Sequence, residues 1–372
     1  MKHCIRILYF SGKRRREARV LSHLADSGLI YLTEITKGDF LHAISSPANF
    51  LTYLSYLRHI VRRFRPHLLF CENSGYSQLP ALFLRLLFRI PLTFNYKGDI
   101  WESYQEIQLL ASSRRKLAKL FQHLVSLLFI HFSNGIFPIS YLFRTRLHNR
   151  LPNLLSKIPT PVVHPDFSPL QAAQFSQTPP LFLRCHPPFL LTVTNFKSFH
   201  KILPLASAVP LLVPYLLRSG IAWYILGDGP FRSLFRHTIQ SHIDSGLVTL
   251  PGWQDPTPYY IRAVAMLYFS GTDGLPNVVL ESFYHRVPVI INTDCPALEY
   301  CTSSVALQIN FHDPDHLERL FTTLQFHRGQ LLGLADRAAQ FLLEEFSLPV
   351  VAPRYYDAIA QVCKQSGVHT PS

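Results

Sequence analysis

Short apolar segments alternate with longer helix-like patterns along almost the whole chain. The segments with the length and content of buried strands are 4–10, 67–73, 91–97, 135–140, 189–195, 222–228, 247–250, 264–270 and 287–292. A helix between two strands carries the chain back across the sheet, so that successive strands pair in parallel. The alternation therefore predicts an α/β fold with parallel sheets that are covered by helices.

A proline-rich passage, QTPPLFLRCHPPF, interrupts this alternation at 177–189. Proline cannot continue a helix or a central strand, so the passage predicts a linker over 177–188. A chain of 372 residues is long enough for two domains. We expect one α/β domain at 1–176, a second at 189–350, and a last helix at 351–372 that is a candidate to cross back to the first domain.

Two such domains leave a cleft between them, and ligands of open α/β sheets bind at the carboxyl ends of the strands. The cleft is therefore the expected place for a ligand. One helix of the second domain is unusual, because prolines 204, 210 and 214 follow Lys201. They predict a helix that is kinked or broken.

Composition excludes several classes of protein. Hydrophobic residues make up 48% and charged residues 16%, which indicates a folded chain. The 6 cysteines form no C-x-x-C pair and the 18 histidines show no H-E-x-x-H spacing, so we expect neither a zinc site nor a catalytic metal. The scattered cysteines, the lack of a leader pattern and the lack of a long apolar span predict a cytoplasmic protein.

The positive charge lies in the first half of the chain. Residues 1–180 contain 23 Lys+Arg and 9 Asp+Glu, whereas residues 181–372 contain 13 and 14. One basic cluster begins at Arg114 and leads into the apolar run 124–132, which favours a helix that lies on an anionic membrane surface. A core helix with a solvated basic start is the alternative. We expect no nucleic-acid partner, because no basic-aromatic motif accompanies the charge.

Two carboxylates stand out in the apolar stretch GTDGLPNVVLESF: Asp273 in a Gly-rich turn and Glu281 in the helix that follows. A solvated helix start is the simple explanation. A helix N-terminus, however, also offers free N–H groups to a phosphate, and carboxylates accept strong hydrogen bonds from sugar hydroxyls. A nucleotide sugar has both chemical features, so the pattern favours a site for one.

At these residues the chain resembles the retaining glycosyltransferases of family 4, which have the GT-B fold of two Rossmann-like domains facing across a cleft. Their pair of acids with seven residues between stands here as DGLPNVVLE, with Asp273 in place of the first Glu. The strand end LGDGP (226–230), the turn in LVTLPGWQD (247–255) and HPDFSPL (164–170) also resemble family segments. The resemblance is specific across 189–300 and looser in the first half.

The resemblance implies both catalytic and donor-binding roles. The candidate catalytic residues are Asp273, Lys201, Asp99 and Lys97. Glu281 would hold the ribose and Asp273 the transferred sugar. The turn between them would contact the sugar and phosphate through its backbone: Gly274, Leu275, Pro276 and Asn277. Gly227, at the G-D-G-P strand end, and Trp253, at the nucleobase turn, are further donor-binding candidates.

The family places an Arg and a Lys, six residues apart, on the diphosphate. Lys201 matches the Lys, but Asn195 stands at the Arg position. Lys197 lies nearby and is either a substitute cation or a solvated loop charge. A diphosphate facing one cation is poorly neutralised, so this departure bears on affinity or donor type.

In the first half, the family motif H-G-x-D corresponds to KGDI, with Lys97 in place of His. Lys97 would bind a phosphate or an acceptor oxygen. Asp99 would orient the acceptor, or else cap a helix. Gly12, in the loop SGKRRRE, would let the backbone approach a phosphate closely, although the loop is not a Walker A sequence.

The resemblance therefore implies an enzyme that transfers a sugar from a nucleoside-diphosphate donor to an acceptor hydroxyl with retention and without a metal cofactor. The expected acceptor is a glycan or a lipid-linked molecule of cell-surface polysaccharide or glycolipid synthesis, reached from the inner face of the membrane. Two alternatives remain open: a non-catalytic relative that binds nucleotide sugars, and a basic nucleic-acid-binding protein.

Overall fold

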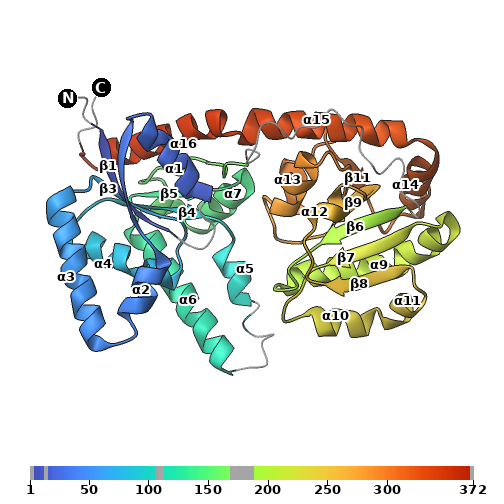
Figure 1. Ribbon diagram of the computed structural model, residues 1–372, viewed down its shortest axis with the longest axis horizontal. Coiled ribbons are helices and arrows are strands. Elements are labelled where there is room, and N and C mark those ends of the chain that lie inside the picture. The colour runs from blue at the N-terminus through green and yellow to red at the C-terminus, as the bar shows by residue number, and fades with distance from the viewer. Residues whose placement is uncertain (1–3, 12–15, 106, 108–112, 168–187, 369–372) are drawn as a thin grey trace. The chain divides into compact units, whose positions relative to one another are not determined.

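A computed structural model describes residues 4–11, 16–105, 107, 113–167 and 188–368 (Figure 1). The chain divides into two compact units. Unit 1 comprises Met1–Phe167 and Phe346–Ser372, and unit 2 comprises Ser168–Glu345. Each unit has its own parallel sheet and its own hydrophobic core. The predicted linker at 177–188 lies outside the described residues except for Pro188.

The sheet of unit 1 has the order β2-β1-β3-β4-β5 in the described part of the chain. All its strand pairs are parallel: β1 (Ile5–Phe10), β2 (Ile30–Ile35), β3 (Leu68–Cys71), β4 (Leu92–Tyr96) and β5 (Gly135–Pro138). The predicted strands are confirmed, and β2 is an additional edge strand. The central strands β3 and β4 and the edge strand β5 are fully buried, which explains their apolar sequences.

The helices of unit 1 cover this sheet. They are α1 (Arg16–Asp26), α2 (Lys37–Ala43), α3 (Pro47–Phe64), η1 (Tyr76–Gln78), α4 (Leu79–Phe88), α5 (Ile100–Gln105), α6 (Ser113–Phe132), α7 (Tyr141–Arg150), α8 (Pro152–Leu155) and α16 (Leu348–Gln365). Serines start two of them, since Ser46 and Ser140 accept hydrogen bonds from backbone N–H groups of α3 and α7.

The last helix, α16, belongs to the core of unit 1. Its buried Tyr355 and Val362 pack in one cluster with Phe70 of β3 and Phe137 of β5. The fit is close at Gly135 in β5, where an added Cβ would lie 2.4 Å from a methyl of Val362. The C-terminal segment is therefore a structural part of unit 1, although almost 180 residues of unit 2 separate it from the rest.

The described sheet of unit 2 has the order β11-β10-β9-β6-β7-β8, again with parallel pairs. Its strands are β6 (Phe189–Val193), β7 (Ala222–Leu226), β8 (Val248–Gly252), β9 (Ala265–Tyr268), β10 (Val289–Asn292) and β11 (Leu307–Ile309). The five predicted strands of this half are confirmed, and the short edge strand β11 is additional. The α/β fold with two parallel sheets predicted from the sequence is confirmed.

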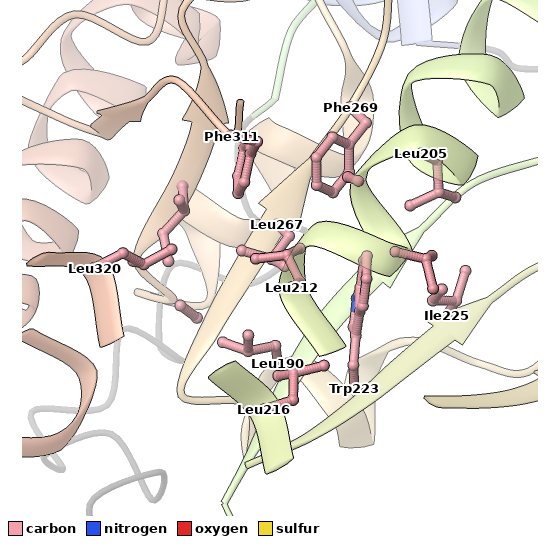
Figure 2. Packing of buried hydrophobic residues seen from close by; sticks show 14 of the residues in the cluster. Leu190, Leu205, Leu212, Leu216, Trp223, Ile225, Leu267, Phe269, Phe311 and Leu320 are labelled. Atoms are coloured by element: carbon pink, nitrogen blue, oxygen red, sulfur yellow. The ribbon is translucent and has the colours of Figure 1, made fainter. Parts of the chain in front are cut away.

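The helices of unit 2 are α9 (Phe199–Ser219), α10 (Arg232–Thr238), α11 (Gln240–Asp244), α12 (Thr257–Tyr260), α13 (Asn277–Tyr284), η5 (Pro296–Glu299), α14 (Pro314–Phe326) and α15 (Arg328–Phe346). Figure 2 shows α9 against the sheet, with Leu212 beside Trp223 and Leu267. Each fully buried side chain of this kind stabilises the fold by about 1.5–3 kcal/mol.

The sequence predicted that α9 is kinked or broken at its prolines. The helix is continuous from Phe199 to Ser219, so a break is excluded, and a kink stays a prediction. Its buried face, which includes Leu205, Val209 and Leu212, is part of the core and offsets the lost backbone hydrogen bonds. By length and composition α9 is also the one helix in the described part of the chain that reaches the hydropathy of a membrane span. Its packing against the sheet accounts for part of that hydropathy, since 33% of the apolar window is buried.

Candidate functional site

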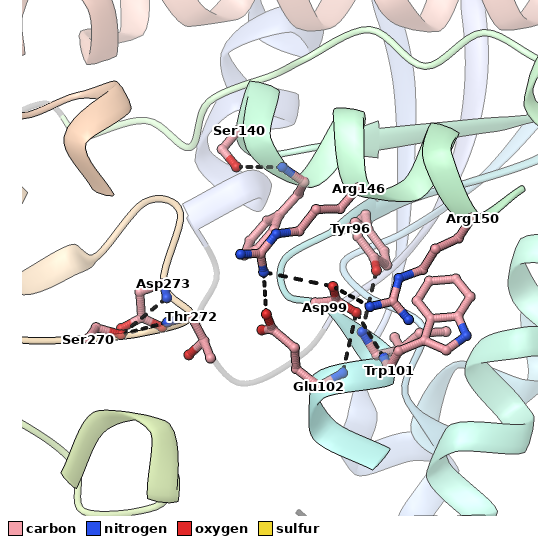
Figure 3. A network of polar contacts seen from close by, with 12 residues as sticks. Tyr96, Asp99, Trp101, Glu102, Ser140, Arg146, Arg150, Ser270, Thr272 and Asp273 are labelled. Atoms are coloured by element: carbon pink, nitrogen blue, oxygen red, sulfur yellow. Dashed lines mark hydrogen bonds and ion pairs between the residues drawn. The ribbon is translucent and has the colours of Figure 1, made fainter. Parts of the chain in front are cut away.

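The loop that leaves β9 carries Asp273 in a fixed position. The hydroxyl oxygen of Ser270 accepts the backbone N–H groups of Thr272 (3.3 Å) and Asp273 (3.1 Å), as Figure 3 shows. Ser270 itself is buried. The carboxylate is thus presented by a tight turn at the carboxyl end of a central strand, as the sequence predicted.

Lys201, in the first turns of α9, meets this carboxylate. Its Nζ lies 2.5 Å from Oδ2 of Asp273, and the hydroxyl of Tyr268 donates to the same oxygen at 2.8 Å. Burial first, and Asp273 second, raise the pKa of Tyr268 well above its ordinary value, so this hydroxyl keeps its proton. The structure therefore brings two of the predicted site residues into direct contact.

A proline connects α9 to the same loop. Pro204 has no N–H, so the carbonyl of His200, four residues earlier, lacks its usual helical donor. The N–H of Gly271 donates to this carbonyl at 3.0 Å. The missing helical bond is thus replaced by a tie between α9 and the Asp273 loop, which the sequence alone did not reveal.

Glu281 lies in the second turn of α13, as predicted, and is half-buried. The hydroxyl of Tyr260 lies 3.2 Å from its Oε2 and 3.3 Å from the carbonyl of Val278. Tyr260 is buried and stacks on His285, with ring centroids 5.2 Å apart and planes at 13°. Burial lowers the pKa of His285, and Asp255 partly opposes the shift, so the stacked imidazole is neutral near pH 7.

The segment between the two acids leads into the start of α13. Gly274, Leu275 and Pro276 are buried and Asn277 is half-buried. Pro276 is the residue before the helix. Within the described part of the chain, no side chain caps this end by a hydrogen bond, and the carbonyl of Pro276 accepts the N–H of Val279 at 3.1 Å. A helix end without a side-chain cap suits an anionic ligand.

The loop after β6, with Asn195 and Lys197, is packed tightly against the G-D-G turn after β7. Gly227 has φ +127°, and a Cβ there would lie 1.6 Å from the carbonyl oxygen of Thr194. Gly229 would meet the carbonyl of Asn195 at 2.3 Å in the same way. These glycines are therefore required by the close approach of two backbones.

Asn195 and Lys197 themselves are exposed, and the side-chain oxygen of Asn195 accepts the N–H of Lys197 at 3.2 Å. Trp253 follows β8 and is 75% exposed. The N–H of Gly227 donates to the carbonyl of Gly252 at 2.8 Å, which ties the β7 turn to the Trp253 turn. The candidate residues of unit 2 thus follow the carboxyl ends of β6, β7, β8 and β9.

In unit 1, Asp99 acts as a cap. Its Oδ1 accepts the N–H groups of Trp101 (2.9 Å) and Glu102 (3.4 Å) at the start of α5. Its Oδ2 lies 3.8 Å from Arg146 and 3.7 Å from Arg150 (Figure 3). The residue is buried, so its carboxylate is held by these contacts, and the structural alternative raised from the sequence has direct support. A role toward the acceptor stays a prediction.

Lys97 lines a cavity of unit 1 of about 830 Å³. Its Nζ lies 3.2 Å from the buried carboxylate of Glu72. The cavity is formed by the loops after β3 and β4 and by α6. Asn95, 1% exposed, also lines it: its Nδ2 donates to the hydroxyl of Tyr355 at 3.0 Å, while its Oδ1 has no partner in the described part of the chain. A ligand hydroxyl would satisfy that oxygen.

The structure does not test every predicted site residue. Gly12 lies outside the described residues. Among the residues that the structure describes, no three His, Cys, Asp or Glu side chains are placed to hold a metal ion. Conversely, sequence reasoning missed Tyr260, Tyr268, Glu72 and Asn95. None of them belongs to a motif, and only the position of Tyr268 at the end of a predicted strand next to Asp273 was a usable signal.

Solved structures with a similar fold identify this architecture. HepE from Anabaena, solved in complex with UDP and glucose, aligns with a TM-score of 0.64 at 12% identity, over 96% of this chain and 99% of HepE. The chain has the GT-B fold. Residues 187–324, which include the predicted donor-binding residues of unit 2, match the family model described as Glycosyl transferases group 1.

Two curated proteins are similar in sequence to this GT-B chain. The putative glycosyltransferase ORF31 of a virus (isolate Australia/Victoria) is 25% identical over 222 residues, which are 59% of this chain and 64% of that protein. The lipopolysaccharide core biosynthesis glycosyltransferase LpsE of Rhizobium meliloti is 24% identical over 178 residues, 46% of this chain and 50% of LpsE. The chain thus matches between half and two-thirds of the length of these relatives.

Proposed function

We propose that the protein is a retaining glycosyltransferase of family 4 that transfers a sugar from a nucleoside-diphosphate donor to an acceptor hydroxyl. The observation that carries the proposal is the contact between Lys201 and Asp273, at 2.5 Å, next to the uncapped start of α13. It joins a cation and a helix N-terminus, which suit phosphate, to a carboxylate, which suits a sugar hydroxyl.

Each group has a role in this proposal. Lys201 has three N–H donors, so it can hold Asp273 and a phosphate oxygen at once. Together with the backbone N–H groups at the start of α13, it would stabilise the negative charge that grows on the diphosphate as the sugar leaves. Glu281, oriented by Tyr260, would bind the ribose, and Asp273 would orient the transferred sugar.

The stereochemical outcome follows from the leaving group. If the departing phosphate takes the proton of the acceptor hydroxyl, the acceptor attacks from the face that the phosphate leaves, and the configuration at the anomeric carbon is retained. No side-chain nucleophile is needed on this route, and no metal ion is part of it. Catalysis then rests on positioning and on the charges around the diphosphate.

The cavity of unit 1 is the proposed acceptor site. It offers the unsatisfied oxygen of Asn95 and the ammonium of Lys97, both suited to hydroxyl groups. HepE was solved with UDP and glucose, which supports a uridine donor. LpsE is named for lipopolysaccharide core biosynthesis, which supports a glycan or lipid-linked acceptor of the cell surface. We place the protein in the cytoplasm, at the inner face of the membrane, with no nucleic-acid partner.

A non-catalytic relative that binds nucleotide sugars is the second candidate. It is favoured by Asn195, which stands exposed where the family has its second diphosphate cation, and by Lys97, which is paired with Glu72. Poor neutralisation of the diphosphate would lower turnover more than binding, because the charge is greatest in the transition state.

Thermal unfolding in the presence of UDP, GDP or ADP tests the binding part of the proposal, because a ligand of the native state raises the unfolding temperature. One of them should stabilise the wild type, and none should stabilise Lys201→Ala. Release of nucleoside diphosphate from the matching donor sugar separates the two candidates: turnover supports the enzyme, and binding without turnover on any acceptor supports the non-catalytic relative.

A further inference from the structure

Helix α6 exposes an apolar stripe. Five large apolar side chains on it are between 38% and 68% exposed: Leu117, Leu120, Phe121, Leu124 and Leu128. At 100° per residue they fall within an arc of about 100°. Such a face is normally the buried face of a helix, and here it is turned to the outside.

The opposite face of α6 is the one that packs on unit 1. Val125, Phe129 and Ile130 are buried, and the ring of Phe129 lies edge-on to Phe94 of β4, with centroids 5.7 Å apart. The helix thus has two apolar faces. The core accounts for one of them, and the exposed stripe has no structural use inside the described part of unit 1.

Helix α4, which contacts α6, also exposes apolar side chains. The two helices are in contact, and Nε of Arg85 on α4 donates to the carbonyl of Phe132 at the end of α6 at 3.2 Å. Three more large apolar side chains of α4 are exposed: Phe83, Leu86 and Leu87. We call the exposed apolar side chains of both helices the α4–α6 face. Monomeric soluble proteins rarely expose so many clustered apolar groups.

The charged side chains of the two helices themselves all have one sign. Neither helix contains Asp or Glu. Arg114 and Lys116 are exposed, and on the projection of α6 they lie within about 40° of the two edges of the stripe. Arg89 is exposed at the end of α4. An apolar surface on helices that carry cations and no carboxylates is complementary to a surface that is apolar inside and anionic at its border, which is the structure of an anionic bilayer.

We propose that unit 1 docks on an anionic lipid bilayer through the α4–α6 face. The leucine and phenylalanine side chains would enter the boundary between head groups and acyl chains, and Arg114 and Lys116 would bind lipid phosphates. The proposed acceptor cavity shares α6 with this face, since Lys119 and Phe121 line it. Docking would therefore bring the cavity to the level of lipid head groups.

Flotation of the full chain with lipid vesicles tests the docking. Vesicles of phosphatidylcholine alone are compared with vesicles that also contain phosphatidylglycerol. The disrupting variant is the double change Leu117→Glu and Leu124→Glu, at positions that are 68% and 51% exposed. Its control is Leu217→Glu and Leu234→Glu, on helices of unit 2 and 70% and 51% exposed. Glu and Leu have similar helix propensities, so both variants should fold.

The wild type and the control should float with the anionic vesicles and lose most of this association at high salt, whereas the α4–α6 variant should stay at the bottom of the gradient. Equal flotation of both variants, or no flotation of the wild type, would overturn the proposal. Size-exclusion chromatography adds a third outcome: a wild-type dimer that the α4–α6 variant converts to monomer, without vesicle binding, would assign the face to a second copy of the chain. Nucleotide binding, measured in parallel on the same variants, tests the donor site separately.

Discussion

Lys201 and Asp273 form an ion pair, with Nζ 2.5 Å from Oδ2, although 71 residues of sequence separate them. The pair joins the start of α9 to the loop after β9, and Tyr268 holds the same carboxylate oxygen. Both partners are partly exposed, so the pair contributes little to stability. Its position at the strand ends favours a role in ligand binding.

Tyr260→Phe removes the hydroxyl next to Glu281 and leaves the ring in the core. One hydrogen bond contributes about 0.5–1.5 kcal/mol, so donor affinity should fall by about 2-fold to 10-fold, measured as KM or as Kd by titration calorimetry. Tyr259→Phe is the matched control, because the hydroxyl of Tyr259 has no hydrogen bond among the described residues. An equal loss in both variants would argue against orientation of Glu281 by Tyr260.

Pro204→Ala returns an N–H to α9, where it competes with Gly271 for the carbonyl of His200. Turnover should fall, by up to about 100-fold if the Asp273 loop shifts by an ångström, while the unfolding free energy stays the same or rises. Pro210→Ala changes the same helix at a position whose freed carbonyl, that of Ala206, has no loop partner among the described residues. This control should keep its activity, and a similar loss in both variants would contradict the proposed tie.

Gly227→Ala should be strongly destabilising. Its Cβ would lie 1.6 Å from the carbonyl of Thr194, so the two loops must separate, at a cost that we place above about 4 kcal/mol. Gly220→Ala is the control, because Gly220 also has a positive φ but has open space around its Cα and should cost only about 1 kcal/mol. Urea unfolding of both variants measures the difference, and equal values would exclude the close approach as the cause.

Acid should weaken the His285 stack. Burial lowers the pKa of His285 in the native state, so the unfolded chain takes up a proton first as the pH falls below about 6.5. The free energy of unfolding should therefore decrease from that pH downward until it passes the native pKa. Replacement by phenylalanine keeps the stack and removes the titration. Its unfolding free energy should fall less between neutral and acidic pH, and an unchanged pH dependence would show that His285 is not responsible.

The sequence predicted most strands because buried parallel strands are continuous apolar runs that few other elements resemble. The two edge strands β2 and β11 were not predicted. The sequence of β2, IYLTEI, is half exposed and includes Glu34, and β11 has only three residues. The continuity of α9 was also missed. Proline has a fixed local cost, and only the packing of Leu205, Val209 and Leu212 on the sheet, which the sequence does not display, offsets it.

The candidate site was predictable where a motif carried it. Asp273, Glu281 and the glycines near 227 stand in short patterns whose spacing reflects a turn or a helix start. Tyr260 was not predictable, because it approaches Glu281 from another helix and its hydroxyl contact exists only after folding. The ion pair between Lys97 and Glu72 was unpredictable for the same reason, because Glu72 follows the neighbouring strand and meets Lys97 only after folding.

The central claim is that Lys201 and Glu281 belong to one donor site, and donor turnover tests it most directly. Release of nucleoside diphosphate is measured for the wild type, Lys201→Ala, Glu281→Ala and the exposed control Arg319→Ala, with unfolding curves for all four. We predict that Lys201→Ala and Glu281→Ala lose at least about 100-fold in turnover with nearly unchanged stability, and that Arg319→Ala keeps the turnover of the wild type. Folded Lys201→Ala and Glu281→Ala proteins with wild-type turnover would contradict the assignment.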